Sequence, residues 1–474
     1  MNRLIWFLFF SFAYFYSNAQ EQLGLRTENY AGINSVLLNP ANNLTSPFRW
    51  DINLIAVGQF VDNNFGGYRD ASIGDLLQAN ERDIFLATDF SSDQQFPAGS
   101  LVFDFADPGQ EKYASFVTNV MGPSLMLNFE KHSFGFFTNF RANLSAQQIL
   151  AILGYYDYLA IDIDESYTVG PAQAAGMVWG EIGLNYLYKT NTSSGNIGIG
   201  VSLKYLRGYE SFFIRNNNTI DATKRPLDAI DFNNGVDIEF GFTTSSVDEE
   251  AVNLQNSGSG FGIDLGITYA SPNYINGEGL KLGLSVLDIG SIQFNNLTEQ
   301  HTIDINNPFF FSPRNLEDVT DFRDGIAQLN EELFPDSDSL VTFTGDSYRL
   351  ALPGAVSLQA DIAIQENLFI NATLINRLPI GENRVERGNL LAITPRYESR
   401  WVSAFLPISI FNYQRMKVGT AIRLAFLTFG TEDLMSFFRR NSLESGDFYL
   451  ALKINPFNLG RKNKGGKEVE CYSF

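Results

Sequence analysis

The stretch 196–207, Asn-Ile-Gly-Ile-Gly-Val-Ser-Leu-Lys-Tyr-Leu-Arg, alternates strictly between apolar side chains and small or polar ones. Ile197 and Val201 belong to the apolar set, and Gly198 and Lys204 belong to the other set. Because successive side chains of a strand point to opposite faces, this period of two predicts a β-strand that is apolar on one face only. The same alternation recurs at 261–270, 280–286 and 356–364.

Segments of this kind follow one another along most of the chain. We predict about 14 strands, with about 12 or 16 as alternatives. The predicted strands are 50–61, 123–130, 134–141, 178–189, 196–207, 260–270, 279–288, 354–364, 367–376, 391–398, 400–411, 415–424, 425–430 and 448–455. Short turns such as 130–133 and 365–367 alternate with long connections such as 208–260 and 291–353. This alternation is typical of a transmembrane barrel with tight periplasmic turns and long extracellular loops.

The composition favours a lipid-facing sheet over a helical membrane protein. Aromatic residues make up 14% of the chain and charged residues only 18%. After residue 20 no apolar run reaches about 18 residues, the length that a membrane-spanning helix needs. An unpaired backbone N–H or C=O is costly inside hydrocarbon, so the sheet must close on itself. We therefore predict an all-β fold, a transmembrane antiparallel β-barrel in the cell outer membrane.

The N-terminal end has the features of a signal peptide. Arg3 precedes the apolar stretch 4–16, and Ser17-Asn18-Ala19 supplies a cleavage site with small residues. The predicted domains are the signal peptide 1–19, an N-terminal periplasmic or hatch segment 20–49, the barrel 50–457 and a basic periplasmic tail 458–474.

Charge and the scarcity of reactive side chains exclude several classes of function. The net charge of −20 disfavours nucleic acid, because phosphate binding needs clustered Lys and Arg. One cysteine, Cys471, and two histidines, His132 and His301, cannot form a tetrahedral zinc site. We expect both histidines in turns or loops and none on a strand, without the nucleophile–base geometry of an enzyme. The sequence thus predicts no enzyme, no cofactor and no metal site.

Polar positions of the strands must line the barrel interior. At about 14 strands this interior is too wide for side chains alone to fill, so water or a chain segment must occupy it. Ionisable residues on the inward faces are candidates to line a permeation path or to bind a plug. The alternative is that they form internal salt bridges with each other and with the hatch. They are Glu181, Lys204, Asp264, Lys281, Asp361 and Arg423.

The segment before the first strand carries two short motifs, Tyr30-Ala31-Gly32 and Asn39-Pro40-Ala41. An Asn-Pro pair favours a turn, because proline disfavours the helical conformation of the residue before it. Their order ahead of an aromatic-rich barrel resembles the FadL-like superfamily of fatty-acid transporters and the PorV- and PorP-like barrels associated with type IX secretion. The stretches 427–434 and 446–453 are similar to the closing strands of the secretion-associated group, and 50–54 to a related branch of unknown function. The resemblance implies that the two motifs form a hatch folded into the lumen.

Two functions remain open from the sequence. The resemblance to fatty-acid transporters implies passive transport of small or hydrophobic molecules. The alternative is a non-transporting partner subunit of an outer-membrane secretion, gliding or assembly complex. In either case the expected partners are outer-membrane lipid and, in the second case, other outer-membrane proteins. An apolar pocket beneath the outer loops and a lateral gap at a strand kink would support transport, whereas a continuously filled lumen would count against it.

The long loops contain further predicted elements. Apolar spacing at 145–153 and 321–334 predicts helices that fold over or into the pore. The stretches 210–215 and 236–242 predict strand extensions above the membrane.

Overall fold

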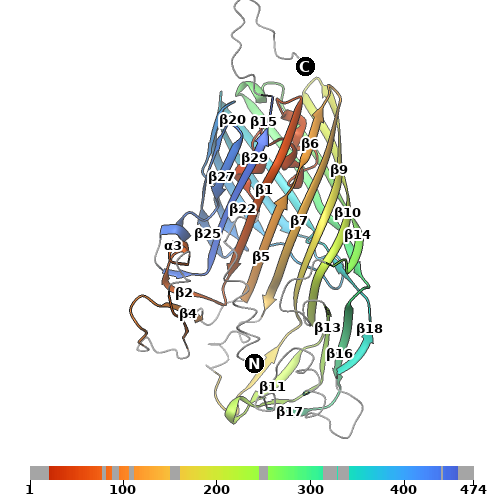
Figure 1. Ribbon diagram of the computed structural model, residues 1–474, viewed down its shortest axis with the longest axis vertical. Coiled ribbons are helices and arrows are strands. Elements are labelled where there is room, and N and C mark those ends of the chain that lie inside the picture. The colour runs from red at the N-terminus through yellow and green to blue at the C-terminus, as the bar shows by residue number, and fades with distance from the viewer. Residues whose placement is uncertain are drawn as a thin grey trace, which may run out of the picture.

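The largest element of the computed structural model is a sheet that closes on itself into a barrel, the upright cylinder of Figure 1. The structure describes residues 21–76, 82–87, 95–105, 112–149, 161–244, 255–312, 328, 341–438 and 441–456. The first wall strand, β1 (Trp50–Asn63), pairs antiparallel with the last, β29 (Ser445–Ile454), and with the next, β5 (Lys112–Met121). Pairing of the first wall strand with the last removes the two free edges that β1 and β29 would otherwise expose to hydrocarbon.

The wall crosses the membrane 14 times with antiparallel neighbours, which confirms the predicted fold class. Some crossings consist of two shorter strands in line, interrupted at Pro123, Pro407 and Gly419. The remaining wall strands are β6 (Ser124–Asn128), β7 (His132–Ile149), β9 (Ala172–Thr192), β10 (Gly195–Asn216), β14 (Gly258–Ala270), β15 (Gly279–Phe294), β19 (Tyr348–Ala351), β20 (Ala355–Gln365), β21 (Leu368–Arg377), β22 (Leu390–Glu398), β23 (Val402–Phe405), β24 (Ile408–Phe411), β25 (Arg415–Val418), β26 (Thr420–Leu424) and β27 (Leu427–Thr431).

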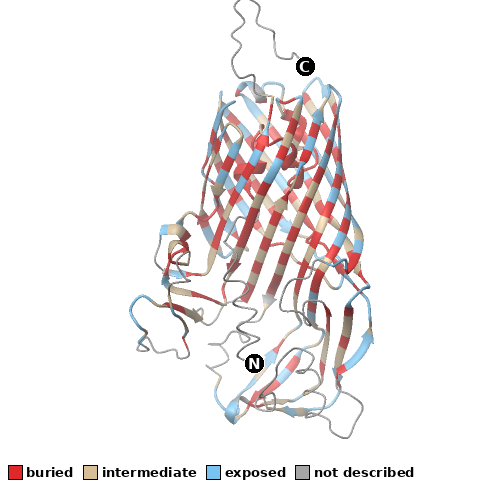
Figure 2. Ribbon diagram, in the orientation of Figure 1, coloured by how far each residue is buried: buried red, intermediate tan, exposed pale blue. Residues whose placement is uncertain are grey.

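Burial alternates along the wall strands with a period of two, visible as colour bands in Figure 2. The outward side chains Leu184, Ile199 and Phe261 are 60%, 56% and 73% exposed, whereas inward neighbours such as Asn185 and Ser202 are buried. Large apolar side chains in such a continuous exposed band are stable only against lipid. Across the described residues, none of the helices is long and apolar enough to cross a membrane.

The end of the barrel with long loops carries additional strands, at the bottom of Figure 1. Beyond the wall, β10 continues to Asn216 and pairs with β13 (Val236–Thr243), which confirms both predicted strand extensions. β13 pairs in turn with β16 (Thr298–Ile305), and β16 pairs with β18 (Val341–Gly345). We assign this end to the cell exterior because the described connections at the opposite end are short.

Two small outer sheets complete this end. One contains β8 (Ser166–Val169), β11 (Ile220–Lys224), β12 (Ile230–Phe232) and β17 (Phe309–Phe311), and the other β2 (Gly66–Ala71), β3 (Ile84–Leu86), β4 (Leu101–Phe105) and β28 (Asn441–Leu443). The second sheet has its own core, in which Tyr68 packs edge-on against Phe103 at 5.5 Å. Burial there raises the pKa of the Tyr68 phenol. Short helical turns flank these sheets at α3 (Ile73–Leu76), η5 (Pro226–Asp228) and α7 (Met435–Phe438).

Two sequence expectations are wrong in detail. Residues 145–149 are not helical but continue strand β7, because they pair with β9 as far as Gln147↔Gln173, and this pairing overrides their helical spacing. The second wall crossing begins at Lys112 in β5 rather than at residue 123, since β5 pairs with β1 from Asn63↔Ala114 onward. The predicted helix 321–334, the signal peptide and the tail lie outside the described residues, apart from Gln328.

Candidate functional site

Residues 21–49 fill the barrel lumen toward its periplasmic end and form the plug, drawn as red coils inside the cylinder in Figure 1. Within it lie α2 (Leu23–Arg26), η1 (Gly32–Leu37) and η2 (Asn42–Thr45), nearly all of whose residues are buried. Lys453 on β29 holds the plug by donating to the carbonyl oxygens of Tyr30 (2.9 Å) and Ala31 (2.5 Å). The plug is therefore bonded directly to the wall.

The Asn39-Pro40-Ala41 motif forms a tight turn against the wall. Asn39 Oδ1 accepts from the Ala41 backbone N–H (2.8 Å), and Asn39 Nδ2 donates to Gln359 Oε1 (3.0 Å). The turn fits because the facing wall residues are glycines: a Cβ on Gly200 would lie 2.5 Å from the carbonyl carbon of Pro40. Here glycine allows two backbones to approach closely.

The Tyr30-Ala31-Gly32 motif is bonded to the start of the first strand. Gly32 has a φ of +59°, and a Cβ there would lie 2.3 Å from the carboxyl carbon of Asp51. That carboxylate accepts the Ile33 backbone N–H (2.9 Å) and lies 3.1 Å from Lys453 Nζ. The Tyr30 ring lies under the guanidinium of Arg423, 4.8 Å from its centroid.

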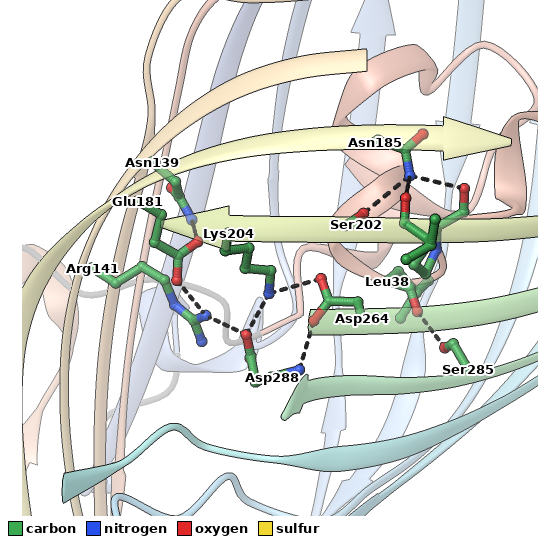
Figure 3. Close-up of polar contacts among 12 residues, drawn as sticks. Leu38, Asn139, Arg141, Glu181, Asn185, Ser202, Lys204, Asp264, Ser285 and Asp288 are labelled. Atoms are coloured by element: carbon green, nitrogen blue, oxygen red, sulfur yellow. Dashed lines mark hydrogen bonds and ion pairs between the residues drawn. The ribbon is translucent and has the colours of Figure 1, made fainter. Parts of the chain in front are cut away.

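Three of the predicted lumen residues, Glu181, Lys204 and Asp264, meet in one buried ion-pair network (Figure 3). At its centre Asp288 accepts from Lys204 Nζ (2.6 Å) and from Arg141 Nη1 (2.9 Å). Arg141 also reaches Glu181 (3.1 Å), and Lys204 reaches Asp264 (2.7 Å). The network links the inner faces of five successive wall strands, β7, β9, β10, β14 and β15.

The other three predicted lumen residues bind the plug or another strand of the wall. Arg423 Nε lies 2.9 Å from the carboxylate of Glu28 in the plug. Lys281 Nζ donates to Thr45 Oγ1 in the plug (3.1 Å). Asp361 lies 2.8 Å from Arg396. All six predicted residues are at most 5% exposed and have oppositely charged or polar partners, as in the salt-bridge alternative.

Asp288, Arg141 and Arg387 are partners of these residues that the alternation did not identify. Asp288 ends the predicted strand 279–288, but in the structure Leu287 and Asp288 are both buried, which breaks the alternation. A β-bulge in β15 causes this break, because Leu287 and Asp288 together oppose the single residue Asp264 of β14. Arg387 lies between β21 and β22 and reaches Asp288 (3.2 Å). A charged residue at the predicted end of a strand was the one available signal.

The hydrogen-bonded wall is interrupted between β25 and β29, in its extracellular half. β27 pairs with β29 only from Leu427↔Leu452 to Gly430↔Tyr449, and the chain then leaves the wall until Ser445. β25 pairs with β24 on one side. On its other side the described residues provide one backbone hydrogen bond, from Leu434 N to Val418 O (2.9 Å). We call the interruption between β25 and β29 the seam.

Charged side chains bridge the seam on its inner side. Lys417 on β25 forms an ion pair with Asp62 on β1 and lies 3.9 Å from Asp433. Arg415 lies 3.6 Å from Asp62 and pairs with Glu444 at the beginning of β29. Side chains thus close the seam where backbone pairing is interrupted.

An apolar cluster lies directly behind these ion pairs. The ring centroid of Phe60 is 4.7 Å from that of Phe411, which is 6.0 Å from that of Tyr113. Leu23 of the plug belongs to the same buried cluster. Next to the end of β25, where Leu434 bonds to Val418, α7 exposes Met435 (54%) and Phe438 (76%). Apolar groups therefore lie both behind the ion pairs of the seam and beside it.

The extracellular mouth of the lumen is also apolar, unlike the charged layer beneath it. Trp179, Phe213, Phe294 and Leu350 pack there in one cluster and are at most 1% exposed. Within the described residues, the plug occupies the periplasmic part of the lumen, and the ion-pair network and this apolar cluster line the part outside it.

Both histidines lie on strands, contrary to prediction. His132 begins β7, and its Nδ1 is 2.9 Å from the Tyr186 hydroxyl. His301 is on β16 between the rings of Phe240 and Phe242, because the outer loops extend the sheet beyond the membrane. Within the described ranges no cluster of three or more His, Cys, Asp or Glu side chains could hold a metal ion.

The sequence profile of the family of unknown function DUF5723 matches residues 40–432. The chain belongs to this family. The matched range of this DUF5723 protein begins at Pro40 in the plug and ends at Glu432, where the chain leaves the wall at the seam. Comparison with curated proteins finds no sequence match.

Solved barrels share low sequence identity with this DUF5723 protein. The toluene transporter TodX of Pseudomonas putida is 10% identical, with 93% of this chain and 98% of TodX covered and a TM-score of 0.40. A Pseudomonas aeruginosa FadL homologue is 9% identical, with 89% and 93% covered and a TM-score of 0.22. The translocator domain of the autotransporter NalP from Neisseria meningitidis is 7% identical, with 90% and 92% covered and a TM-score of 0.30.

Proposed function

We propose that this DUF5723 protein passively transports small apolar molecules between the cell exterior and the outer-membrane bilayer through the seam. The observation that carries the proposal is the interruption of backbone pairing between β25 and β29. In hydrocarbon, a wall without backbone pairs is costly unless other groups satisfy it. A barrel with a purely structural role would gain stability from continuous backbone pairing between these strands.

The plugged lumen counts against transport along the barrel axis, so the proposal rests on a lateral route. A molecule moving along the barrel axis would have to displace the buried network around Asp288 and then the plug, which Lys453 and Arg423 hold. Breaking one such buried ion pair costs about 3–5 kcal/mol. Opening the seam has to separate one buried pair, Lys417 with Asp62, together with the pair of Arg415 and Glu444, whose side chains are 24% and 20% exposed and cost less to separate.

The chemistry of the seam selects the class of solute. Its outer side opens toward lipid, and its inner side presents the rings of Phe60, Phe411 and Tyr113. A charged solute would lose its hydration on leaving the lumen, whereas an apolar solute gains from entering hydrocarbon. The transported molecules are therefore small and apolar.

The test locks the seam covalently. In a Cys471→Ser background, Arg415→Cys with Glu444→Cys places two thiols where paired side chains now meet, and a short bismaleimide or a mild oxidant joins them. The matched control joins Leu374→Cys to Leu391→Cys, which face each other across the continuous pair β21–β22. Uptake of an apolar fluorescent dye by intact cells is expected to fall when oxidation locks the seam and to recover when the disulfide is reduced. Oxidation of the control pair should leave uptake unchanged. Equal uptake with the seam locked and unlocked would contradict the proposal.

A second candidate is a partner subunit of an outer-membrane complex that transports nothing itself. Its support is the folded outer end, which exposes Leu227 (63%), Phe310 (57%) and Phe343 (57%) to solvent. Exposed apolar side chains on a folded surface are typical of protein contacts. Stoichiometric outer-membrane proteins that co-purify in mild detergent, and are lost in a Phe310→Ser/Phe343→Ser variant, would support this function.

A further inference from the structure

We infer that the lipid-facing wall over β20–β23 binds one phospholipid of the ethanolamine type, with its acyl chains in two hollows and its headgroup at the periplasmic rim between Arg400 and Glu366. This site lies on the outer face of the barrel and shares no residue with the seam. It does not depend on the proposed transport function.

The larger hollow has a volume of about 510 Å³ and is almost entirely apolar. It forms where two small outward residues, Ala360 on β20 and Ala372 on β21, face each other across the sheet. Their neighbours Leu282, Leu358 and Leu374 are larger and form its walls. Most outward positions of the wall carry large side chains, so this pair of alanines leaves a recess of a kind that a flexible hydrocarbon chain fills.

A second hollow of about 340 Å³ lies next to the first, toward the periplasmic rim. Its small residue is Ala404 on β23, which faces Tyr397 on β22. Leu368 and Ile370 on β21 line this hollow, and Ala372 on the same strand lines the larger one. Together they provide an apolar surface that runs along β21 from the rim toward the middle of the membrane, which is the direction of lipid acyl chains.

The rim above the second hollow carries one exposed positive and one exposed negative side chain. Arg400 lies in the β22–β23 turn with its guanidinium 5.7 Å from the ring of Trp401, which is 38% exposed. Glu366 is exposed in the β20–β21 turn. The two turns are adjacent, because the Glu398 backbone N–H donates to the Asn367 carbonyl oxygen (2.8 Å).

These charges match a zwitterionic headgroup with a primary ammonium. Arginine suits a phosphate, and a carboxylate accepts hydrogen bonds from an ammonium. Tryptophan is favoured at the membrane interface, where Trp401 lies. Glu366 and the net charge of −20 would repel an anionic headgroup. Phosphatidylethanolamine is therefore preferred over phosphatidylglycerol.

The experiment measures lipid adducts of the full-length protein by native mass spectrometry, after delipidation and addition of phosphatidylethanolamine or phosphatidylglycerol. Wild type is expected to bind one phosphatidylethanolamine more tightly than phosphatidylglycerol. Ala360→Leu/Ala404→Leu fills both hollows and should lose the adduct, whereas Val201→Leu, on the lipid face of β10, should keep it. Glu366→Gln should abolish the preference between the two lipids.

Arg400→Gln should lower the affinity for both lipids about fivefold, which is the effect of one basic side chain near a phosphate surface. Arg49→Gln, which removes an exposed arginine just before β1, should leave both affinities unchanged. Retention of the adduct in the filled-hollow variant overturns the inference. The inference is also overturned if the wild type is a dimer and the filled-hollow variant becomes a monomer that still binds the lipid. In that case a second copy of the chain, and not a lipid, occupies the hollows. Unchanged lipid preference in Glu366→Gln overturns the headgroup assignment.

Discussion

The wall of this barrel differs between the side formed by β9, β10 and β14 and the side formed by β23 to β29. On the first side, β9 and β10 pair from Gly195↔Thr192 to Asn216↔Ala172 with a single bulge after Gly208. On the second side, strands β23 to β27 are short and broken at Pro407 and Gly419. Proline lacks the backbone donor that a central strand needs, which accounts for the break at Pro407. Backbone hydrogen bonds join the strands on the first side, whereas side-chain ion pairs replace them over part of the second side.

The plug meets these two sides in correspondingly different ways. Against the continuous side, its Asn39-Pro40 turn contacts the backbone of β10 at Gly200. Against the interrupted side, it is held by charge: Glu28 pairs with Arg423, and the Leu23 backbone N–H donates to Glu432 (2.5 Å). Backbone contact fixes position closely, whereas ion pairs can separate and form again. The interrupted side is therefore the one suited to movement.

The largest expected effect lies on the continuous side. Asp288→Asn removes the central anion that Arg141, Lys204 and Arg387 share in a buried site. The free energy of unfolding should fall by about 3–5 kcal/mol, because cations remain buried with too few counter-charges. Urea unfolding in detergent micelles, followed by tryptophan fluorescence, measures this loss.

Asp304→Asn is the control for this variant, since Asp304 is an exposed residue of the outer extension. Its free energy of unfolding should stay within about 0.5 kcal/mol of wild type. Dye uptake should be unchanged in both variants. Increased uptake in Asp288→Asn would mean that the axial route, not the seam, is the permeable one.

A smaller effect is expected where the plug meets the continuous side. The Cβ of Gly200→Ala would come within 2.5 Å of Pro40 backbone, so the plug or the strand must shift. Such overpacking costs about 1–3 kcal/mol. Protease cleavage of the plug should become faster along with the loss of stability. Gly345→Ala, whose new Cβ would have no neighbour closer than 3.9 Å, should show neither effect.

The continuous side could be predicted from the sequence, because its signal is local. In 196–207 the alternation alone shows which side chains face lipid and which face the lumen. The predicted strands 178–189 and 196–207 lie within β9 and β10. The inward position of Lys204 and Asp264 followed from the same alternation. Their partner Asp288 did not, because a β-bulge shifts the phase of the alternation by one residue.

The seam could not be predicted, because it depends on which strands fail to pair. The stretches 400–411 and 415–424 appeared as single strands, and Pro407 and Gly419 within them gave no information about the neighbouring strand. The excursion 432–444 appeared as an ordinary loop. The contact of Lys417 with Asp62 joins residues far apart in sequence and requires the closed barrel.

The smallest expected effect on stability lies at the seam, and it distinguishes the two sides most directly. Arg415→Gln removes an ion pair with Glu444 whose partners are 24% and 20% exposed, so the free energy of unfolding should fall by about 1 kcal/mol or less. Arg225→Gln removes more exposed pairs, with Asp231 and Asp164 at an outer sheet, and should leave stability close to that of wild type. The two variants should differ in dye uptake, because only Arg415 bridges an interruption in the wall. Uptake should rise in Arg415→Gln and stay at the wild-type level in Arg225→Gln. Equal uptake in the two variants would mean that the ion pairs at the seam do not restrict passage.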